Sequence, residues 1–204
     1  MIRLAIALAF ASLAFAQTRT MSQGAHRMEI TLERLEGSTW HAVDPGLVLA
    51  DGDRVRFKYR TNFDGYLYVD DLGTSGKSAT LFPNADTGQD NHVTASKDYQ
   101  IPATDGAVFR VAGPPGYDVV TFVVNPHKGG VTSAGPPRPK PGLIPRCDDS
   151  LLRARGDCID SSAGPKPGYG SRDLVFMREG RQTVVSSPTP LTAPVVYHFL
   201  LAHK

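Results

Sequence analysis

Cysteine is scarce in this chain of 204 residues, which contains only Cys147 and Cys158. Two cysteines cannot supply the repeated Cys pairs of zinc-binding modules, and the six histidines include no H-E-x-x-H pair. A G-x-S-x-G nucleophile motif is also missing from the sequence. Zinc chemistry and this class of serine hydrolysis therefore have little support, and we expect no cofactor and no catalytic residues.

The chain also lacks a large excess of charged residues of either sign. The formal net charge is +2 at pH 7, and acidic and basic residues are interspersed along the sequence. Nucleic acid and anionic membrane surfaces both select clustered Lys and Arg. The charge balance therefore argues against either of them as the main partner.

The sequence also has little in the way of long hydrophobic runs. The N-terminal run Leu4–Phe15 has about a dozen residues, whereas a membrane-spanning helix needs roughly 20. Arg3 precedes this run and the small-x-small motif Ala14–Ala16 ends it, which is the order of a secretory signal peptide. We expect residues 1–16 to be that signal, residues 17–27 to be a flexible arm, and the mature protein to be periplasmic or extracellular, with no membrane span.

An exported chain reaches an oxidising space, where two nearby cysteines usually form a disulfide. We predict a bond between Cys147 and Cys158, which would close a short loop and contribute roughly 3 kcal/mol through chain entropy. Two free thiols are the alternative, because the sequence does not show the geometry of the pair.

The rest of the chain contains several stretches in which apolar and polar residues alternate. In Arg54–Arg60, Val55, Phe57 and Tyr59 share one face and four basic residues share the other. We interpret the basic face as a solvated strand surface in preference to a polyanion site. Further short alternations are separated by turns of Gly, Pro, Asn and Asp, a pattern typical of an antiparallel β-sandwich of Ig-like or Greek-key type.

We expect residues 28–204 to form one such domain. Its core strands lie in residues 49–125, and a Pro- and Gly-rich insertion over 126–171 carries the two cysteines. Within the insertion, residues 148–155 could form one or two helical turns and the remainder reads as loop. Two or three terminal strands would hardly be stable alone, so residues 172–204 should close the sandwich against the core.

The stretch GTSGKS, Gly73–Ser78, looks like the end of a phosphate-binding loop. Such a loop needs a glycine five positions before Gly76, where this chain has Asp71, whose carboxylate would repel phosphate. The residues that follow read as a strand ended by Pro83 and not as a helix. We therefore place Gly73–Lys77 at the tip of a β-hairpin.

Two acidic stretches are candidates for chemistry. Residues 84–92 offer oxygen ligands for calcium, namely Asp86, Asp90 and Asn91. The stretch lacks the glycine and the glutamate of the helix-loop-helix calcium pattern, so an ordinary polar loop is the preferred interpretation. Asp70 and Asp71 could act as a general acid and base, yet adjacent residues of a strand point to opposite faces and do not form a facing pair.

Five short boxes occur in a fixed order between residues 49 and 125, and they are Gly52–Asp53, Gly65–Tyr68, Leu81–Pro83, Ile101–Pro102 and Pro114–Asp118. The ordered set resembles the bacterial domain-of-unknown-function family 4384. The resemblance implies an accessory β module of exported or multidomain bacterial proteins, and it supplies no catalytic residues. The boxes also read as structural, since Gly65 and Gly116 permit turns and the prolines end strands.

Together these patterns predict an exported, non-catalytic β-sandwich that binds another envelope protein or an extracellular polymer through strand edges, Pro-rich loops or aromatic residues. The candidate recognition residues are Trp40, Tyr66, Tyr68 and Tyr117. Core packing is the competing interpretation of these aromatic residues. The alternative functions are a metal-dependent envelope hydrolase that uses residues 84–92 and a structural subunit of a surface assembly.

Overall fold

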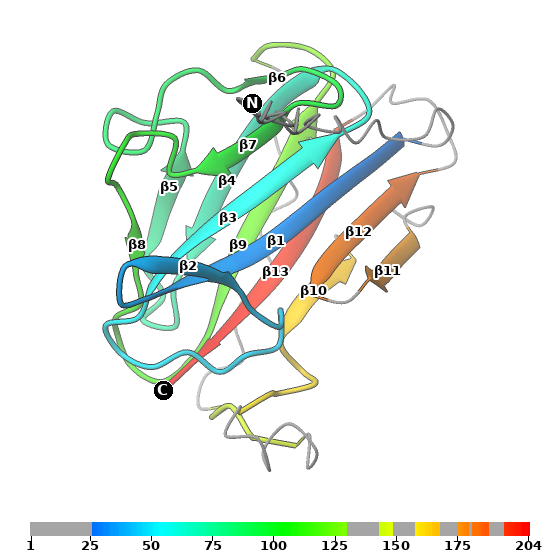
Figure 1. The fold of residues 1–204 in the computed structure, drawn as a ribbon. Coiled ribbons are helices and arrows are strands. Elements are labelled where there is room, and N and C mark those ends of the chain that lie inside the picture. The colour runs from blue at the N-terminus through cyan, green and yellow to red at the C-terminus, as the bar shows by residue number, and fades with distance from the viewer. Residues whose placement is uncertain (1–25, 130–142, 149–157, 168–174, 180, 188–193) are drawn as a thin grey trace, which may run out of the picture.

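A computed structural model describes residues 26–129, 143–148, 158–167, 175–179, 181–187 and 194–204. These residues form two antiparallel sheets stacked face to face, with β1 and β3 in front of β4, β9 and β13 in the view of Figure 1. The predicted antiparallel β-sandwich is therefore confirmed. The described ranges contain no helix long and apolar enough to cross a membrane.

The first sheet follows the order β11, β12, β1, β3, β7, with β2 beside β1 and β8 beside β3. Its strands are β1 (His26–Glu36), β2 (Thr39–Ala42), β3 (Arg54–Thr61), β7 (Asp98–Ile101), β8 (Phe109–Arg110), β11 (Val175–Glu179) and β12 (Gln182–Ser187). The second sheet follows the order β10, β13, β9, β4, β5, with β6 beside β4. Its strands are β4 (Gly65–Leu72), β5 (Ser78–Phe82), β6 (His92–Val93), β9 (Gly116–Asn125), β10 (Gly164–Pro167) and β13 (Val195–His203).

Aromatic side chains from both sheets meet in the core. Phe57 of β3 lies edge-on to Phe122 of β9 and to Phe199 of β13, with ring centres 5.2 and 5.5 Å apart. Phe122 in turn stacks on Tyr197 at 5.0 Å. All four side chains are buried, so the alternating residues of three strands join the two sheets through one aromatic cluster.

Strands outside the stretch 49–125 complete both sheets. β13 pairs with β9 from Val195 to His203, and β12 pairs with β1. The segment 172–204, expected to close the sandwich, thus contributes to both layers (Figure 1). His26 and Arg27, which we assigned to the flexible arm, are instead the first residues of β1, because that strand continues along β12 beyond its apolar pattern.

The tip of the β4–β5 hairpin lies at Gly73–Lys77, as predicted. Gly65 and Gly116, however, are the first residues of strands and do not form the turns we expected. A Cβ atom at Gly65 would lie 2.9 Å from the carbonyl oxygen of Asn125, and one at Gly116 would lie 2.5 Å from Cγ2 of Thr74. The neighbouring backbone of β9 therefore selects glycine at position 65, whereas a φ of +156° and the Thr74 side chain together select it at position 116.

One part of the insertion differs from the loop that we expected. Gly164–Pro167 forms β10, which pairs with β13 at the edge of the second sheet. An edge strand tolerates proline because one side of its backbone has no neighbouring strand to receive a hydrogen bond. The helical turns predicted at 148–155 lie almost wholly outside the described residues.

Candidate functional site

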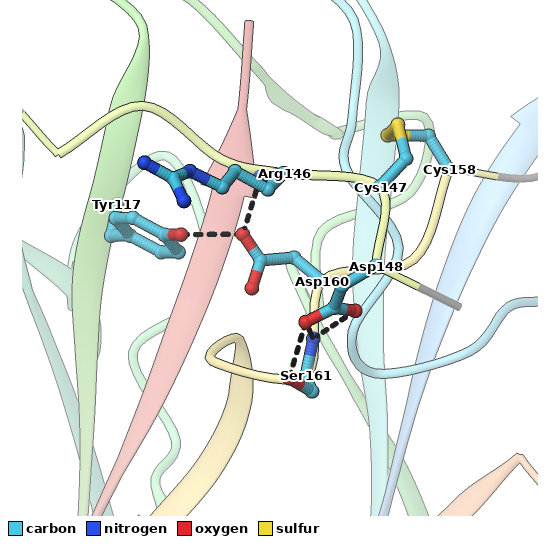
Figure 2. The surroundings of a disulfide bond; sticks show 7 residues. All are labelled: Tyr117, Arg146, Cys147, Asp148, Cys158, Asp160 and Ser161. Atoms are coloured by element: carbon cyan, nitrogen blue, oxygen red, sulfur yellow. Dashed lines mark hydrogen bonds between the residues drawn. A yellow bond between two sulfur atoms is a disulfide. The ribbon is translucent and has the colours of Figure 1, made fainter. Parts of the chain in front are cut away.

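A disulfide holds two segments of the insertion together (Figure 2). Cys147 and Cys158 are bonded, as the sequence predicted. Beside the bond, the Asp148 N–H donates to the carbonyl oxygen of Ile159 at 3.0 Å. The Val48 N–H donates to the carbonyl oxygen of Cys158 at 2.8 Å. We call residues 146–148 and 158–159 the disulfide segment. Its two parts are joined to each other by the disulfide and the Asp148–Ile159 hydrogen bond, and the Val48–Cys158 hydrogen bond attaches it to the sandwich.

A buried carboxylate lies beneath this segment. Asp160 is only 2% exposed, and its Oδ2 atom accepts a hydrogen bond from the Tyr117 hydroxyl at 2.5 Å and one from the Arg146 N–H at 2.7 Å (Figure 2). Its Oδ1 atom accepts a hydrogen bond from the Ser162 N–H at 2.8 Å. Burial acts to raise the pKa of Asp160, but these donors outweigh it and lower the pKa overall. The ionised carboxylate therefore fixes Arg146 to strand β9.

An apolar pair precedes this anchored point. Leu143 and Ile144 are 51% and 66% exposed and are the exposed large apolar side chains among the residues the structure describes. They are followed by Pro145, which is buried, and then by Arg146 and the disulfide. Isolated apolar residues are common on protein surfaces. This pair is adjacent in sequence and precedes the anchored residues Arg146 and Cys147, which limits the conformational freedom of the backbone that follows it.

The aromatic candidates do not form one surface. Tyr66 and Tyr68 lie on the outer face of β4, where the Tyr66 ring contacts the ring of His92 at 5.2 Å and the Tyr68 hydroxyl accepts a hydrogen bond from the Gly129 N–H at 3.1 Å. Tyr117 binds Asp160 beneath the disulfide segment. Trp40 belongs to β2 of the other sheet. The structure therefore places the four residues in three separate regions.

The basic face of β3 is paired with acidic side chains. Arg56 donates from Nε to Glu33 at 2.6 Å, Lys58 lies 3.5 Å from the same carboxylate, and Arg60 lies 3.7 Å from Asp98. The Arg56 guanidinium also lies 4.3 Å from the centre of the Trp40 ring. Neighbouring strands thus supply carboxylates to three of the four basic side chains, which agrees with our interpretation of a solvated strand face.

Residues 84–92 use their polar groups to shape the loop itself. Asn84 accepts from the N–H groups of Asp86 and Thr87 at 2.9 Å, and Asp90 accepts from the His92 N–H at 3.1 Å. Asn91 is buried and donates to the carbonyl oxygen of Leu67 at 3.1 Å. Across the described ranges, no three Asp, Glu, His or Cys side chains are grouped so that they could hold a metal ion.

A second polar group, which we call the acidic cluster, lies under the hairpin tip and consists of Asp71, Thr74, Asp118 and His203. Asp118 accepts from the N–H and the hydroxyl of Thr74 at 2.7 and 2.9 Å, and its Oδ1 atom lies 3.2 Å from Nε2 of His203. Burial acts to raise the pKa of Asp118, but the contacts with His203 and Thr74 lower it overall. Oδ1 of Asp71 is buried without a hydrogen-bond partner.

The two carboxyl groups of this cluster therefore differ in proton affinity. Burial, followed by the nearby charge of Asp118, raises the pKa of Asp71 to about 7, while His203 acts in the opposite direction. A small hollow of about 160 Å³ opens beside the pair and is lined by Thr74 and Lys77 as well. The arrangement can hold a proton on Asp71 near neutral pH while Asp118 stays ionised.

The sequence analysis did not identify Asp118, His203, Asp160 or the Leu143–Ile144 pair as functional candidates. The alternation of strand residues could have identified Asp118 and His203. Each lies on the same face of its strand, β9 or β13, as the core residues, and Asp71 does so in β4. Asp160 and the apolar pair lie in irregular backbone, where no such period exists.

Comparison with known proteins finds a family match for one segment of the chain. Residues 48–128 match the family described as Domain of unknown function (DUF4384), which confirms the resemblance carried by the five sequence boxes. No curated protein and no solved structure matches the chain. The matched segment contains Tyr117, Asp118 and the hairpin tip, whereas the disulfide segment and β13 lie beyond it.

Proposed function

We propose that this chain, whose residues 48–128 match a family of unknown function, is an exported, non-catalytic β-sandwich that binds another protein of the cell envelope. Leu143 and Ile144 form the centre of its binding surface, and the disulfide segment holds them in place. The exposure of this apolar pair on an anchored backbone is the observation that carries the proposal.

Export is supported by two features. The order of Arg3, the apolar run and the small-x-small motif is that of a secretory signal, and the Cys147–Cys158 bond is of a kind that persists in oxidising compartments. The mature protein would begin after residue 16, and it would work in the periplasm or outside the cell.

The physical case for binding rests on preorganisation. Apolar residues at the centre of an interface contribute most when they enter a pocket that excludes water. Beyond Pro145, which follows the pair, Arg146 is fixed by its hydrogen bond to Asp160, and Cys147 is fixed by the disulfide (Figure 2). Association would then cost little ordering of the backbone, so a partner with an apolar pocket gains most of the burial energy of two side chains.

The non-catalytic part of the proposal concerns three carboxyl groups with shifted pKa values, which are Asp71, Asp118 and Asp160. Asp160 has three donors that satisfy its charge, and we assign it to anchoring. Asp71 and Asp118 hold a proton inside the fold, and we assign them to conformational control. Metal-independent turnover of an envelope substrate that disappears in Asp71→Asn would contradict this part of the proposal.

Site-specific crosslinking tests the binding surface. A photoreactive amino acid would replace Ile144 in the exported protein, and a second variant would carry it at Ala79, an exposed position on β5. We expect one envelope protein to crosslink from position 144 and not from position 79, and we expect the product to be lost in a Leu143→Ser background. Equal products from both positions, a polymer product, or crosslinks only to a second copy would contradict the proposal.

A further inference from the structure

Three side chains of the acidic cluster form a diagonal line across three neighbouring strands. Asp71 lies opposite Val120, Asp118 lies opposite Leu201, and His203 lies opposite Gly116. Each charged residue is therefore displaced by two positions from the next, on the same face of the sheet, which is within reach of long or charged side chains. The line ends at the β4–β5 hairpin on one side and at the C-terminal strand on the other.

The hydrogen-bond donors of this cluster are unevenly distributed. Asp118 receives both donors of Thr74 and faces Nε2 of His203. Asp71 shares the same end of the sheet, yet its buried Oδ1 atom receives none. The hydrogen bonds of the cluster therefore stabilise one negative charge, carried by Asp118, and none of them reaches the buried Oδ1 atom of Asp71.

We propose that Asp71, Asp118 and His203 form a proton-operated clasp, which fixes the tip of the β4–β5 hairpin to the second sheet while Asp71 is protonated and loosens it when Asp71 ionises. The moving part is the tip Gly73–Lys77, which the two Thr74 donors attach to Asp118. Within the tip, the Gly73 N–H donates to the carbonyl oxygen of Lys77 at 2.9 Å. The clasp is a regulatory property that does not depend on the Leu143–Ile144 surface.

Like-charge repulsion supplies the driving force. Protonated Asp71 leaves a single carboxylate in the cluster, whereas ionised Asp71 places a second negative charge beside Asp118 with one of its oxygen atoms, Oδ1, shielded from water. Because burial raises the pKa of Asp71 to about 7, the closed form binds a proton that the open form releases nearer the usual carboxyl value. Closure is therefore strongest at low pH, weakens as pH rises towards 7, and changes little above it.

Other charged groups around the clasp are few. Lys77 lines the same hollow from the hairpin, and the loop before β9 contributes Ala112, Gly113 and Pro114 to the lining without a charge. Asp70, the neighbour of Asp71, points to the other face and accepts a hydrogen bond from the Thr80 hydroxyl at 2.9 Å. Asp70→Asn is therefore a matched control, since it removes the same charge one residue away from the cluster.

Hydrogen exchange of the Thr74 amide tests the clasp directly, because this amide donates to Asp118. The protein alone would be compared at about pH 5 and about pH 8, with a chelator present and with rates corrected for intrinsic exchange. We expect protection to fall about tenfold at the higher pH, after a discount for the partial exposure of Asp71. The fall should vanish in Asp71→Asn and persist in Asp70→Asn.

Carboxyl carbon NMR of the unmodified protein provides a second measurement that needs no variant. We expect the Asp71 carboxyl to titrate near neutral pH. Titration near the ordinary carboxyl value, or equal effects of Asp70→Asn and Asp71→Asn on Thr74 exchange, would overturn the clasp. Restoration of protection by calcium at the higher pH would also overturn it, because the carboxyl pair would then be a cation site.

Discussion

At the scale of single residues, the buried Asp160 carboxylate links the disulfide segment to β9. We predict that Tyr117→Phe lowers the free energy of unfolding at neutral pH by about 1.5–3 kcal/mol, because it removes the hydroxyl that donates to an ionised group. The pKa of Asp160 is lowered in the folded protein, so its stabilisation is complete above the ordinary carboxyl pKa and is lost as pH falls through the folded value. In the variant the folded pKa of Asp160 moves back towards the ordinary carboxyl value, so this loss should be smaller and should be complete at a higher pH in urea unfolding curves.

His198 gives a second residue-scale prediction. It is 1% exposed, shares a hydrogen bond of 3.0 Å with the Thr121 hydroxyl, and has a pKa lowered by burial. The unfolded chain takes up a proton near pH ~6.5 that the folded chain resists, so this contribution to stability is lost as pH falls below that value. We expect His198→Gln to flatten the fall in unfolding free energy on the acid side. An unchanged slope would show that another group causes it.

The sequence predicts the faces of residues in strands better than their roles. Alternation correctly placed Val55, Phe57 and Tyr59 in the core and the basic residues outside. The same rule separated Asp70 from Asp71, but it could not show that Asp71 would face Asp118, because their meeting depends on the register of two strands some 47 residues apart in the chain. The register between two such strands depends on packing, and the local sequence pattern of each strand does not determine it.

At the scale of elements, removal of the Cys147–Cys158 bond tests how the disulfide segment is held in place. We expect Cys147→Ser combined with Cys158→Ser to lower the free energy of unfolding by about 3 kcal/mol, since the short loop is no longer closed in the unfolded chain. Exchange of the Asp148 amide, which donates to Ile159, should accelerate more than exchange in the core strands. An unchanged amide would mean that the hydrogen bonds alone hold the segment.

Turn chemistry predicted several elements and missed others. The hairpin tip at Gly73–Lys77 followed from glycine spacing and from the strand pattern that surrounds it. Strand β10 escaped prediction because its two prolines usually mark loops, and only its place at a sheet edge makes them acceptable. The need for glycine at Gly65 and Gly116 was only partly predicted, because both positions also lie in contact with a segment distant in the sequence.

At the scale of the whole molecule, the family segment depends on strands outside it. β13 lies between β9 and β10, and β1 lies between β12 and β3. We predict that residues 48–128 expressed alone show no cooperative unfolding transition, whereas residues 26–204 do, as measured by near-UV circular dichroism in urea. A cooperative transition in the short fragment would show that β1 and β13 only cover a core that is stable without them.

Fold class could be predicted from the sequence because short alternations and turn residues recur along the chain. The surface that we propose for binding could not, since Leu143 and Ile144 read as part of a Pro-rich loop until Arg146 and Cys147 are seen to be fixed beside them. Exposure and anchoring are properties of the folded molecule.

The affinity of the protein for the partner captured from position 144 tests this surface most directly. The account predicts that Leu143→Ser combined with Ile144→Ser weakens binding at least about tenfold, with the free energy of unfolding unchanged, because exposed side chains contribute little to the fold. Ala79→Ser should leave the affinity unchanged. Equal affinities for the double variant and the unmodified protein would contradict the assignment of Leu143 and Ile144 as the binding surface.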